Sequence, residues 1–252
     1  MNNISAIIIT QNEERNIARC LRSLQGIADE VVVVDSGSTD GTEQLCRAAG
    51  CRFERHDWEG YAEQKNYANS LATHPWILSI DADEALSPEL AESLLTFKQQ
   101  PDGGSNAYSM NRLTYFRDHA IRHCGWYPER KIRLFRKGAA RWDGIVHEEL
   151  LFEGKATPLR GDLLHYPYSG ADDLKAKYTK YATLMGEKYY AQGHRVTALG
   201  SLLHPLWTFV RNYLFRLGFL DGADGWTICR LMAHYTSMKY KTLHKLQHSQ
   251  HA

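Results

Sequence analysis

The chain has 252 residues, a formal net charge of +1 at pH 7, and a hydrophobic fraction of 43%. This length allows one domain of about 150 to 200 residues plus an appendage. Its five cysteines form no C-x-x-C pair, which argues against a disulfide framework or a zinc site. The first apolar run begins at Ile4, so we expect no secretory signal peptide and a cytosolic protein with reduced thiols.

Three apolar runs in the first third of the chain predict strands. The runs at 4–10 and 30–35 are nearly continuous β-branched sequence, which is typical of parallel strands covered on both faces. A third run, at 76–80, is equally apolar. We therefore expect these three segments to lie side by side in one sheet.

Helices are predicted between these strands. Ile17, Leu21 and Leu24 recur at helical spacing, which predicts a helix over 13–24. A second helix is expected up to Ala49, with its cap in the polar segment before it and Gly50 as its end. Alternating strands and helices predict an α/β sheet whose ligands bind outside the carboxyl ends of the strands.

Carboxylates stand at those strand ends. The run at 76–80 leads directly into Asp81 and Asp83, and Asp35 ends the run before it. Mg²⁺ is usually held by one or two carboxylates, while substrate phosphates and water fill its other positions. An isolated Asp-x-Asp is more often a turn or a helix cap. Here the motif indicates a metal site because it directly follows a predicted buried strand. The chain contains neither G-x-G-x-x-G nor a Walker A sequence, which argues against dinucleotide and P-loop binding.

The C-terminal part of the chain is basic. Residues 172–252 carry 11 Lys and Arg against 5 Asp and Glu, which leaves 19 against 24 in residues 1–171. Such a tail suits nucleic acid or an anionic lipid surface. We favour lipid because the segment 205–217 predicts an amphipathic helix rich in aromatic residues. Arg211 and Arg216 interrupt it, so a spanning helix is not expected, and an ordinary core helix is the alternative.

Four segments together resemble a known family. Residues 10–13 read Thr-Gln-Asn-Glu, and residues 34–42 read Val-Asp-Ser-Gly-Ser-Thr-Asp-Gly-Thr. With the Asp-Ala-Asp at 81–83, they resemble the family 2 glycosyltransferases of the GT-A fold. The segment 218–225, Gly-Phe-Leu-Asp-Gly-Ala-Asp-Gly, is similar to an element of one branch, the small bacterial enzymes that resemble the lipopolysaccharide core heptose β-1,4-glucosyltransferase.

This resemblance implies a fold, an activity and a location. The implied fold is a GT-A (Rossmann-like), mostly parallel sheet flanked by helices, with a catalytic domain at 1–171 and a helical, basic, membrane-associating region at 172–252. The implied enzyme is an inverting, metal-dependent hexosyltransferase. It would use Mg²⁺ or Mn²⁺ to move glucose from a UDP-sugar to a heptose of the lipopolysaccharide inner core. We expect it to be peripheral at the inner face of the cytoplasmic membrane, with no nucleic-acid partner.

The alternatives are transfer to a polyprenyl phosphate or another cell-envelope glycan, and a non-catalytic nucleotide-binding scaffold. A nucleotidyltransferase is disfavoured because Gln11 and its neighbours stand where a glycine-rich phosphate loop is usual.

The resemblance also implies roles for single residues. Asp83 is the expected metal ligand, with Asp81 and His147 as further candidates. Contacts to the nucleotide sugar are expected from a set of five residues: Thr10, Glu13, Asp35, Lys65 and Asp81.

The acceptor hydroxyl needs a general base, and Glu148 is our candidate, with Glu149 and Asp143 left open. The segment 125–137 carries five basic residues. We expect it to border the donor diphosphate and the acceptor, with a strand that exposes a basic face as the alternative.

Overall fold

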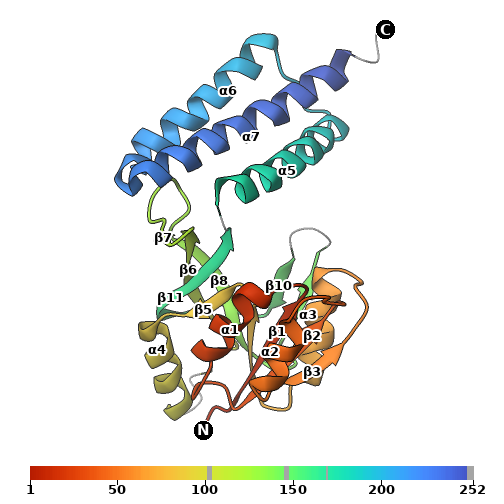
Figure 1. Ribbon diagram of the computed structural model, residues 1–252, viewed down its shortest axis with the longest axis vertical. Helices are drawn as coiled ribbons and strands as arrows, with labels where there is room; N and C mark the ends of the chain where they lie inside the picture. The colour runs from red at the N-terminus through yellow and green to blue at the C-terminus, as the bar shows by residue number, and fades with distance from the viewer. Residues whose placement is uncertain (101–103, 145–147, 169, 249–252) are drawn as a thin grey trace. The chain divides into compact units, whose positions relative to one another are not determined.

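The computed structural model describes residues 1–100, 104–144, 148–168 and 170–248. The chain divides into two compact units (Figure 1). The first consists of Met1–Leu113 and Glu129–Tyr166, and the second of Thr114–Pro128 and Pro167–Ala252. The segment 114–128 thus groups with the C-terminal helices. The division into a catalytic part, 1–171, and a membrane-associating part, 172–252, stays a prediction.

Most strands of a nine-stranded sheet belong to the first unit, and the short strand β7 belongs to the second. The strand order of this sheet is β3-β2-β1-β4-β8-β6-β11-β5, with β7 paired to β6 and a separate hairpin of β9 and β10. In chain order the strands are β1 Ile4–Thr10, β2 Glu30–Asp35, β3 Arg52–Arg55, β4 Trp76–Asp81, β5 Glu84–Leu86, β6 Ala107–Phe116, β7 His119–Ala120, β8 Glu129–Arg136, β9 Ala140–Asp143, β10 Glu149–Phe152 and β11 Thr157–Tyr168.

The sheet is mixed. Strands β3, β2, β1 and β4 run parallel, as the sequence predicts, whereas β8 pairs antiparallel with both β4 and β6. The α/β fold class is confirmed, but the parallel pairing stops at β4. Parallel neighbours need a long crossover connection, usually a helix, and helices join the first four strands of the chain.

Helices cover both faces of this sheet. Successive residues of β1 point to opposite faces, so Ile8 packs with α1, α2 and α4, whereas Ile7 packs with α3. The helices are α1 Glu14–Ser23, α2 Thr42–Ala48, α3 Tyr61–Leu71 and α4 Pro88–Gln99. Their buried residues confirm the predicted helical spacing, since Ile17, Leu21 and Leu24 all lie in the first of these cores.

The second unit is helical. It contains α5 Ala171–Ala191, α6 Ala198–Val210, the π-helical turn η1 Arg211–Phe215, the 3₁₀ turn η2 Gly218–Asp221 and α7 Gly222–His248. Helix α7 packs against both α5 and α6 (Figure 1). The core of this unit joins Leu174 and Ile228 of the helices to Phe116 and Ile121 of the earlier segment.

The segment 218–225 has a structural role within this unit. A Cβ atom on Gly225 would lie 1.9 Å from the carbonyl oxygen of Gly218, so the two glycines allow a close backbone approach. The Asp221 carboxylate accepts hydrogen bonds from the backbone N–H groups of Arg122 and His123 and contacts the His123 ring at 2.9 Å. The element therefore ties the segment 114–128 to the start of α7.

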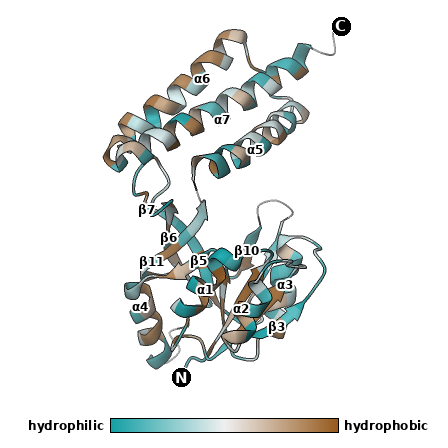
Figure 2. Cartoon of the chain, viewed as in Figure 1, coloured by the Kyte–Doolittle hydropathy of each residue, from teal (hydrophilic) through white to brown (hydrophobic). Residues whose placement is uncertain are grey.

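Helix α6 exposes much of its apolar surface. The predicted helix at 205–217 begins earlier, at Ala198, and passes into the π-helical turn at Arg211. Asn212 is fully buried in this turn, while apolar side chains face outward. These exposed side chains are Leu199, Leu202, Leu203, Leu206, Trp207, Leu214 and Phe215, here called the α6 apolar face. Figure 2 shows the hydrophobic colour along α6. No helix within the described residues is both long and apolar enough to cross a bilayer.

Candidate active site

The carboxyl ends of β1, β2 and β4 lie next to one another. In the strand register Thr10 pairs with Asp35, and Ile9 pairs with Asp81. The fold thus brings together three polar strand ends that are far apart in sequence. The hydroxyl oxygen of Thr10 is buried and has no hydrogen-bond partner among the described residues.

Asp35 is buried at the start of the loop after β2. One carboxylate oxygen accepts hydrogen bonds from the backbone N–H groups of Gly37, at 2.9 Å, and Ser38, at 2.8 Å. The other accepts one from the Ser38 hydroxyl. The buried Gln64 amide, which the sequence analysis did not single out, donates to the Ser36 hydroxyl at 2.9 Å. Asp35 and Gln64 together fix the shape of this loop.

The loops after β1 and β2 are joined to each other. The backbone N–H of Glu13 donates to the Thr42 hydroxyl, and the backbone N–H of Glu14 donates to Asp40. Burial raises the pKa of Glu13, and the negative charges of Asp83, Asp40 and Asp81 add to this, against a hydrogen bond from Asn16. Glu13 therefore lies within electrostatic reach of the Asp-Ala-Asp segment, and its contact with the nucleotide sugar stays a prediction.

Lys65 connects two distant carboxylates. Its side chain comes from α3 and is 3% exposed. The ammonium nitrogen lies 3.1 Å from Asp81 Oδ1 and 2.9 Å from Glu148 Oε1. It also lies 4.6 Å from the ring centroid of Trp142, a cation–π contact. A buried lysine needs such partners, because desolvation penalises an isolated ammonium.

Arg133 is the second cation of this cluster, and the sequence analysis did not single it out. It lies in the middle of β8, 4% exposed, with its guanidinium 2.5 Å from Asp81 Oδ2 and 2.7 Å from Glu84 Oε1. Burial alone would raise the pKa of Asp81, but Arg133 and Lys65 hold it well below its usual range.

The only sequence signal for Arg133 was its place in the basic segment 125–137. This segment contains β8, but Arg133 points inward, so it is not a strand with a uniformly exposed basic face.

Asp83 is more open than Asp81. Its carboxylate is 22% exposed and lies 3.4 Å from His165 Nε2. Both oxygens of Asp81 already contact cations, so Asp83 has more capacity for a metal ion. Within the described parts of the chain, no three His, Cys, Asp or Glu side chains converge on one point as a metal site. His147, the third predicted ligand, lies outside the described residues.

The three candidate bases differ in their surroundings. Glu148 is 20% exposed and contacts Lys65. Glu149 and Asp143 pair with each other in the register of the β9–β10 hairpin, and both are exposed. The structure therefore brings Glu148, Lys65 and Asp81 together. Within the described residues, Glu149 makes no hydrogen bond or ion pair to this cluster.

An α/β sheet with carboxylates and cations gathered at its strand ends has the arrangement of an enzyme whose ligand binds at this edge of the sheet. The model of the family described as "Glycosyl transferase family 2" matches residues 5–149. The chain belongs to this family and is a glycosyltransferase. Its resemblance to the family, read from the sequence, is confirmed.

The chain is also similar to curated proteins along most of its length. It is 34% identical to the lipopolysaccharide core biosynthesis glycosyltransferase LpsC of Rhizobium meliloti, over 97% of this chain and 94% of that protein. It is 30% identical to an uncharacterized glycosyltransferase of Rickettsia typhi, over 98% of this chain and 88% of that protein.

Among solved structures, the chain is similar to glucosyl-3-phosphoglycerate synthase of Mycobacterium tuberculosis, crystallised with Mn²⁺, UDP and glucosyl-3-phosphoglycerate. The identity is 23%, over 46% of this chain and 44% of that chain, with a TM-score of 0.37. A likeness of this size carries no argument about the site.

Proposed function

We propose that this glycosyltransferase moves glucose from UDP-glucose to a heptose of the lipopolysaccharide inner core, with inversion at the sugar carbon. The observation that carries the proposal is the buried Lys65 ammonium, which contacts both Asp81 and Glu148. One ammonium group therefore contacts both Asp81, a carboxylate on the proposed donor side, and Glu148, the candidate base. The similarity to LpsC, named for lipopolysaccharide core biosynthesis, supports this choice of acceptor.

The donor nucleotide would occupy the ends of β1 and β2. Thr10 offers a buried hydroxyl without a partner among the described residues, and Asp35 is held in a preformed loop. Glu13 lies within electrostatic range of Asp83 and Asp81, and Lys65 contacts Asp81 at 3.1 Å. These groups suit a uridine base and its ribose.

Asp83 would hold a divalent cation, Mg²⁺ or Mn²⁺. Its partly exposed carboxylate fits the usual pattern in which one or two protein carboxylates and substrate phosphates share the metal. Asp81 would contact the ribose or a metal-bound water, because both of its oxygens already contact cations. When bound, the metal stabilises the negative charge that accumulates on the departing diphosphate.

Glu148 would remove the proton of the acceptor hydroxyl. Its Oε1 atom lies 2.9 Å from the Lys65 ammonium, which holds the side chain in place beside Asp81. The hydroxyl oxygen then attacks the sugar carbon as the bond to the diphosphate breaks, and the proton passes to Glu148. Attack from the side opposite the diphosphate would convert an α-linked donor into a β-glycoside.

We further propose that the enzyme associates with the inner face of the cytoplasmic membrane through the α6 apolar face. Its leucine, tryptophan and phenylalanine side chains are between 51% and 70% exposed. Exposed apolar surface of this kind, beside a basic segment, suits an anionic membrane interface. Such a location would bring the enzyme to a membrane-anchored acceptor.

The testing experiment is thermal unfolding with UDP, GDP, CMP and their sugar conjugates, each with and without Mn²⁺. A ligand at about 100 times its Kd adds about 2.7 kcal/mol to the free energy of unfolding. We expect a manganese-dependent rise in Tm with UDP and UDP-glucose, followed by UDP release on addition of a heptose-terminated core acceptor. Stabilisation by UDP-glucose without transfer to any acceptor would favour the scaffold instead.

A further inference from the structure

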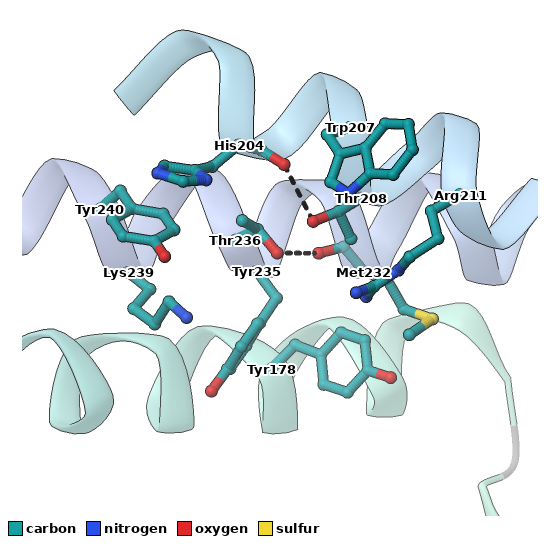
Figure 3. A pocket seen from close by; sticks show the side chains of 10 residues that line it. All are labelled: Tyr178, His204, Trp207, Thr208, Arg211, Met232, Tyr235, Thr236, Lys239 and Tyr240. Atoms are coloured by element: carbon teal, nitrogen blue, oxygen red, sulfur yellow. Dashed lines mark hydrogen bonds between the residues drawn. The ribbon is translucent and has the colours of Figure 1, made fainter. Parts of the chain in front are cut away.

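A cavity lies within the helical unit. It has a volume of about 400 Å³, is open to solvent on one side and is lined by side chains from α5, α6, η1 and α7. The lining residues are Tyr178, His204, Trp207, Thr208, Arg211, Met232, Tyr235, Thr236, Lys239 and Tyr240, drawn in Figure 3. The proposed transfer reaction uses none of these side chains, so the cavity needs an account of its own.

Two cationic side chains, Arg211 and Lys239, line this cavity, and none of its ten lining residues is Asp or Glu. Arg211 Nε is buried and has no hydrogen-bond partner within the described residues. Neither Arg211 nor Lys239 takes part in an ion pair among the described residues. In Figure 3 the Arg211 side chain extends from its helix into the ring of lining residues. Both residues are partly exposed, and cationic side chains without acidic partners favour an anionic ligand.

Aromatic rings contact one of the two cations, Lys239. The Lys239 ammonium lies 4.5 Å from the ring centroid of Tyr189 and 4.6 Å from that of Tyr240. Tyr240 in turn stacks on His204, with ring centroids 4.3 Å apart. Burial raises the pKa of Tyr235 and of Tyr240, so both phenols keep their protons at neutral pH. The cavity thus combines two cations with hydroxyl donors, which matches a phosphate group.

The cavity borders the α6 apolar face. Trp207 belongs to both, since it lines the cavity and is 54% exposed. On the same helix, Leu203, one turn before Trp207, is 51% exposed, and Leu206, the residue directly before it, is 59% exposed. A ligand with a phosphate at one end and hydrocarbon at the other could contact both surfaces at once.

We propose that this cavity binds the phosphate headgroup of an anionic membrane lipid, with the acyl chains against the α6 apolar face. Arg211 and Lys239 would contact the phosphate oxygens, and Trp207 would lie at the headgroup boundary. The proposal rests on the proposed membrane association and adds a specific headgroup site to it. Charge complementarity, together with the shared Trp207, favours lipid over a soluble phosphate ester.

The test is sedimentation of the full chain with phosphatidylcholine vesicles, with and without phosphatidic acid. We expect tighter binding to vesicles that contain phosphatidic acid. Arg211→Gln and Lys239→Gln should each weaken this binding about tenfold, the equivalent of about 1.4 kcal/mol for a lost charged contact. The control Lys241→Gln removes the same charge from an exposed position on α7 outside the cavity, and it should change binding less than about twofold.

Three outcomes would overturn the proposal. Equal weakening by Lys241→Gln would indicate diffuse electrostatic attraction, and equal binding to pure phosphatidylcholine would remove the need for a headgroup site. Arg211-dependent stabilisation by inorganic phosphate, with no binding to phosphatidic acid vesicles, would indicate a soluble ligand. Because Arg211→Gln could perturb folding, its Tm and that of Lys239→Gln are measured in parallel. Stabilisation by UDP is measured in the same variants. If UDP still stabilises them, a negative vesicle result counts against this proposal and not against the proposed transferase function.

Discussion

Lys65 and Glu148 form an ion pair of 2.9 Å although 83 positions separate them in the chain. The same ammonium lies 3.1 Å from Asp81, so one side chain from α3 joins the end of β4 to the start of β10. Three parts of the first unit therefore depend on a single buried charge.

Replacing Lys65 with Met should reduce both stability and transfer. Removing one member of a buried ion pair typically costs about 3 to 5 kcal/mol, because the carboxylates keep their desolvation penalty. We expect a fall of about 3 kcal/mol in the free energy of unfolding. At a temperature where the variant is folded, kcat/KM should still fall by at least about 100-fold.

Lys98→Met is the matched control, since Lys98 forms an ion pair of 2.9 Å with Asp29. It should lose stability but keep kcat. If Lys65→Met behaved the same way, the contact would be structural only.

Glu148→Gln tests the base directly. The amide keeps the size of the side chain but cannot accept the acceptor's proton, so kcat should fall by about 10² to 10⁴. Stabilisation by UDP should survive. Glu149→Gln, in the exposed hairpin, should retain turnover. Full activity in Glu148→Gln would indicate that Glu149 or Asp143 is the general base.

Asp83→Asn tests the metal. We expect the manganese-dependent part of the UDP stabilisation to disappear, because a neutral amide is a weaker ligand for a hard cation. The rise in Tm that UDP causes without Mn²⁺ should remain. Glu92→Gln removes a carboxylate from an exposed position on α4 and should leave the metal dependence unchanged. An unaltered manganese response in Asp83→Asn would exclude Asp83 as the ligand.

Glu30 should make stability depend on pH. Burial alone would raise its pKa, but hydrogen bonds from Ser5 and Thr73 hold the pKa below its ordinary value. A depressed carboxyl pKa stabilises the fold above the unfolded pKa of about 4.3, and this stabilisation is lost as the pH falls through the folded value.

Glu30→Gln should therefore lower the free energy of unfolding by about 1 kcal/mol at pH 7. The difference should shrink below about pH 4, as measured by urea unfolding at several pH values. Glu54→Gln, whose side chain is 38% exposed, should change stability by less than about 0.5 kcal/mol at either pH. A pH-independent loss in Glu30→Gln would contradict the assignment.

Gly225→Ala should destabilise the helical unit. The new Cβ would meet the Gly218 carbonyl oxygen at 1.9 Å, and backbone cannot move aside as a side chain can. We expect a loss of about 3 kcal/mol, seen as a lower urea midpoint. Gly170→Ala adds a Cβ where nothing lies within 4 Å and should cost less than about 1 kcal/mol. Equal losses would mean that the close approach is not what the glycine provides.

Local patterns determined much of the first unit. The β-branched runs predicted β1, β2 and β4, and the spacing of Ile17, Leu21 and Leu24 predicted the buried face of α1. Periodicity predicts these elements because a strand or helix exposes its pattern within a few residues. The family motifs, which are equally local, implied Asp81 and Asp83 at the end of β4.

Contacts between distant segments were decided only by the tertiary structure. Arg133 reads as one of five basic residues in its segment, and only the antiparallel pairing of β8 with β4 brings it to Asp81. The amphipathic pattern near Arg211 likewise predicted a helix, but not that Asn212 is buried while the leucines of α6 are exposed. Composition and spacing show that a helix has one apolar and one polar face. Packing against another element decides which of the two faces is buried.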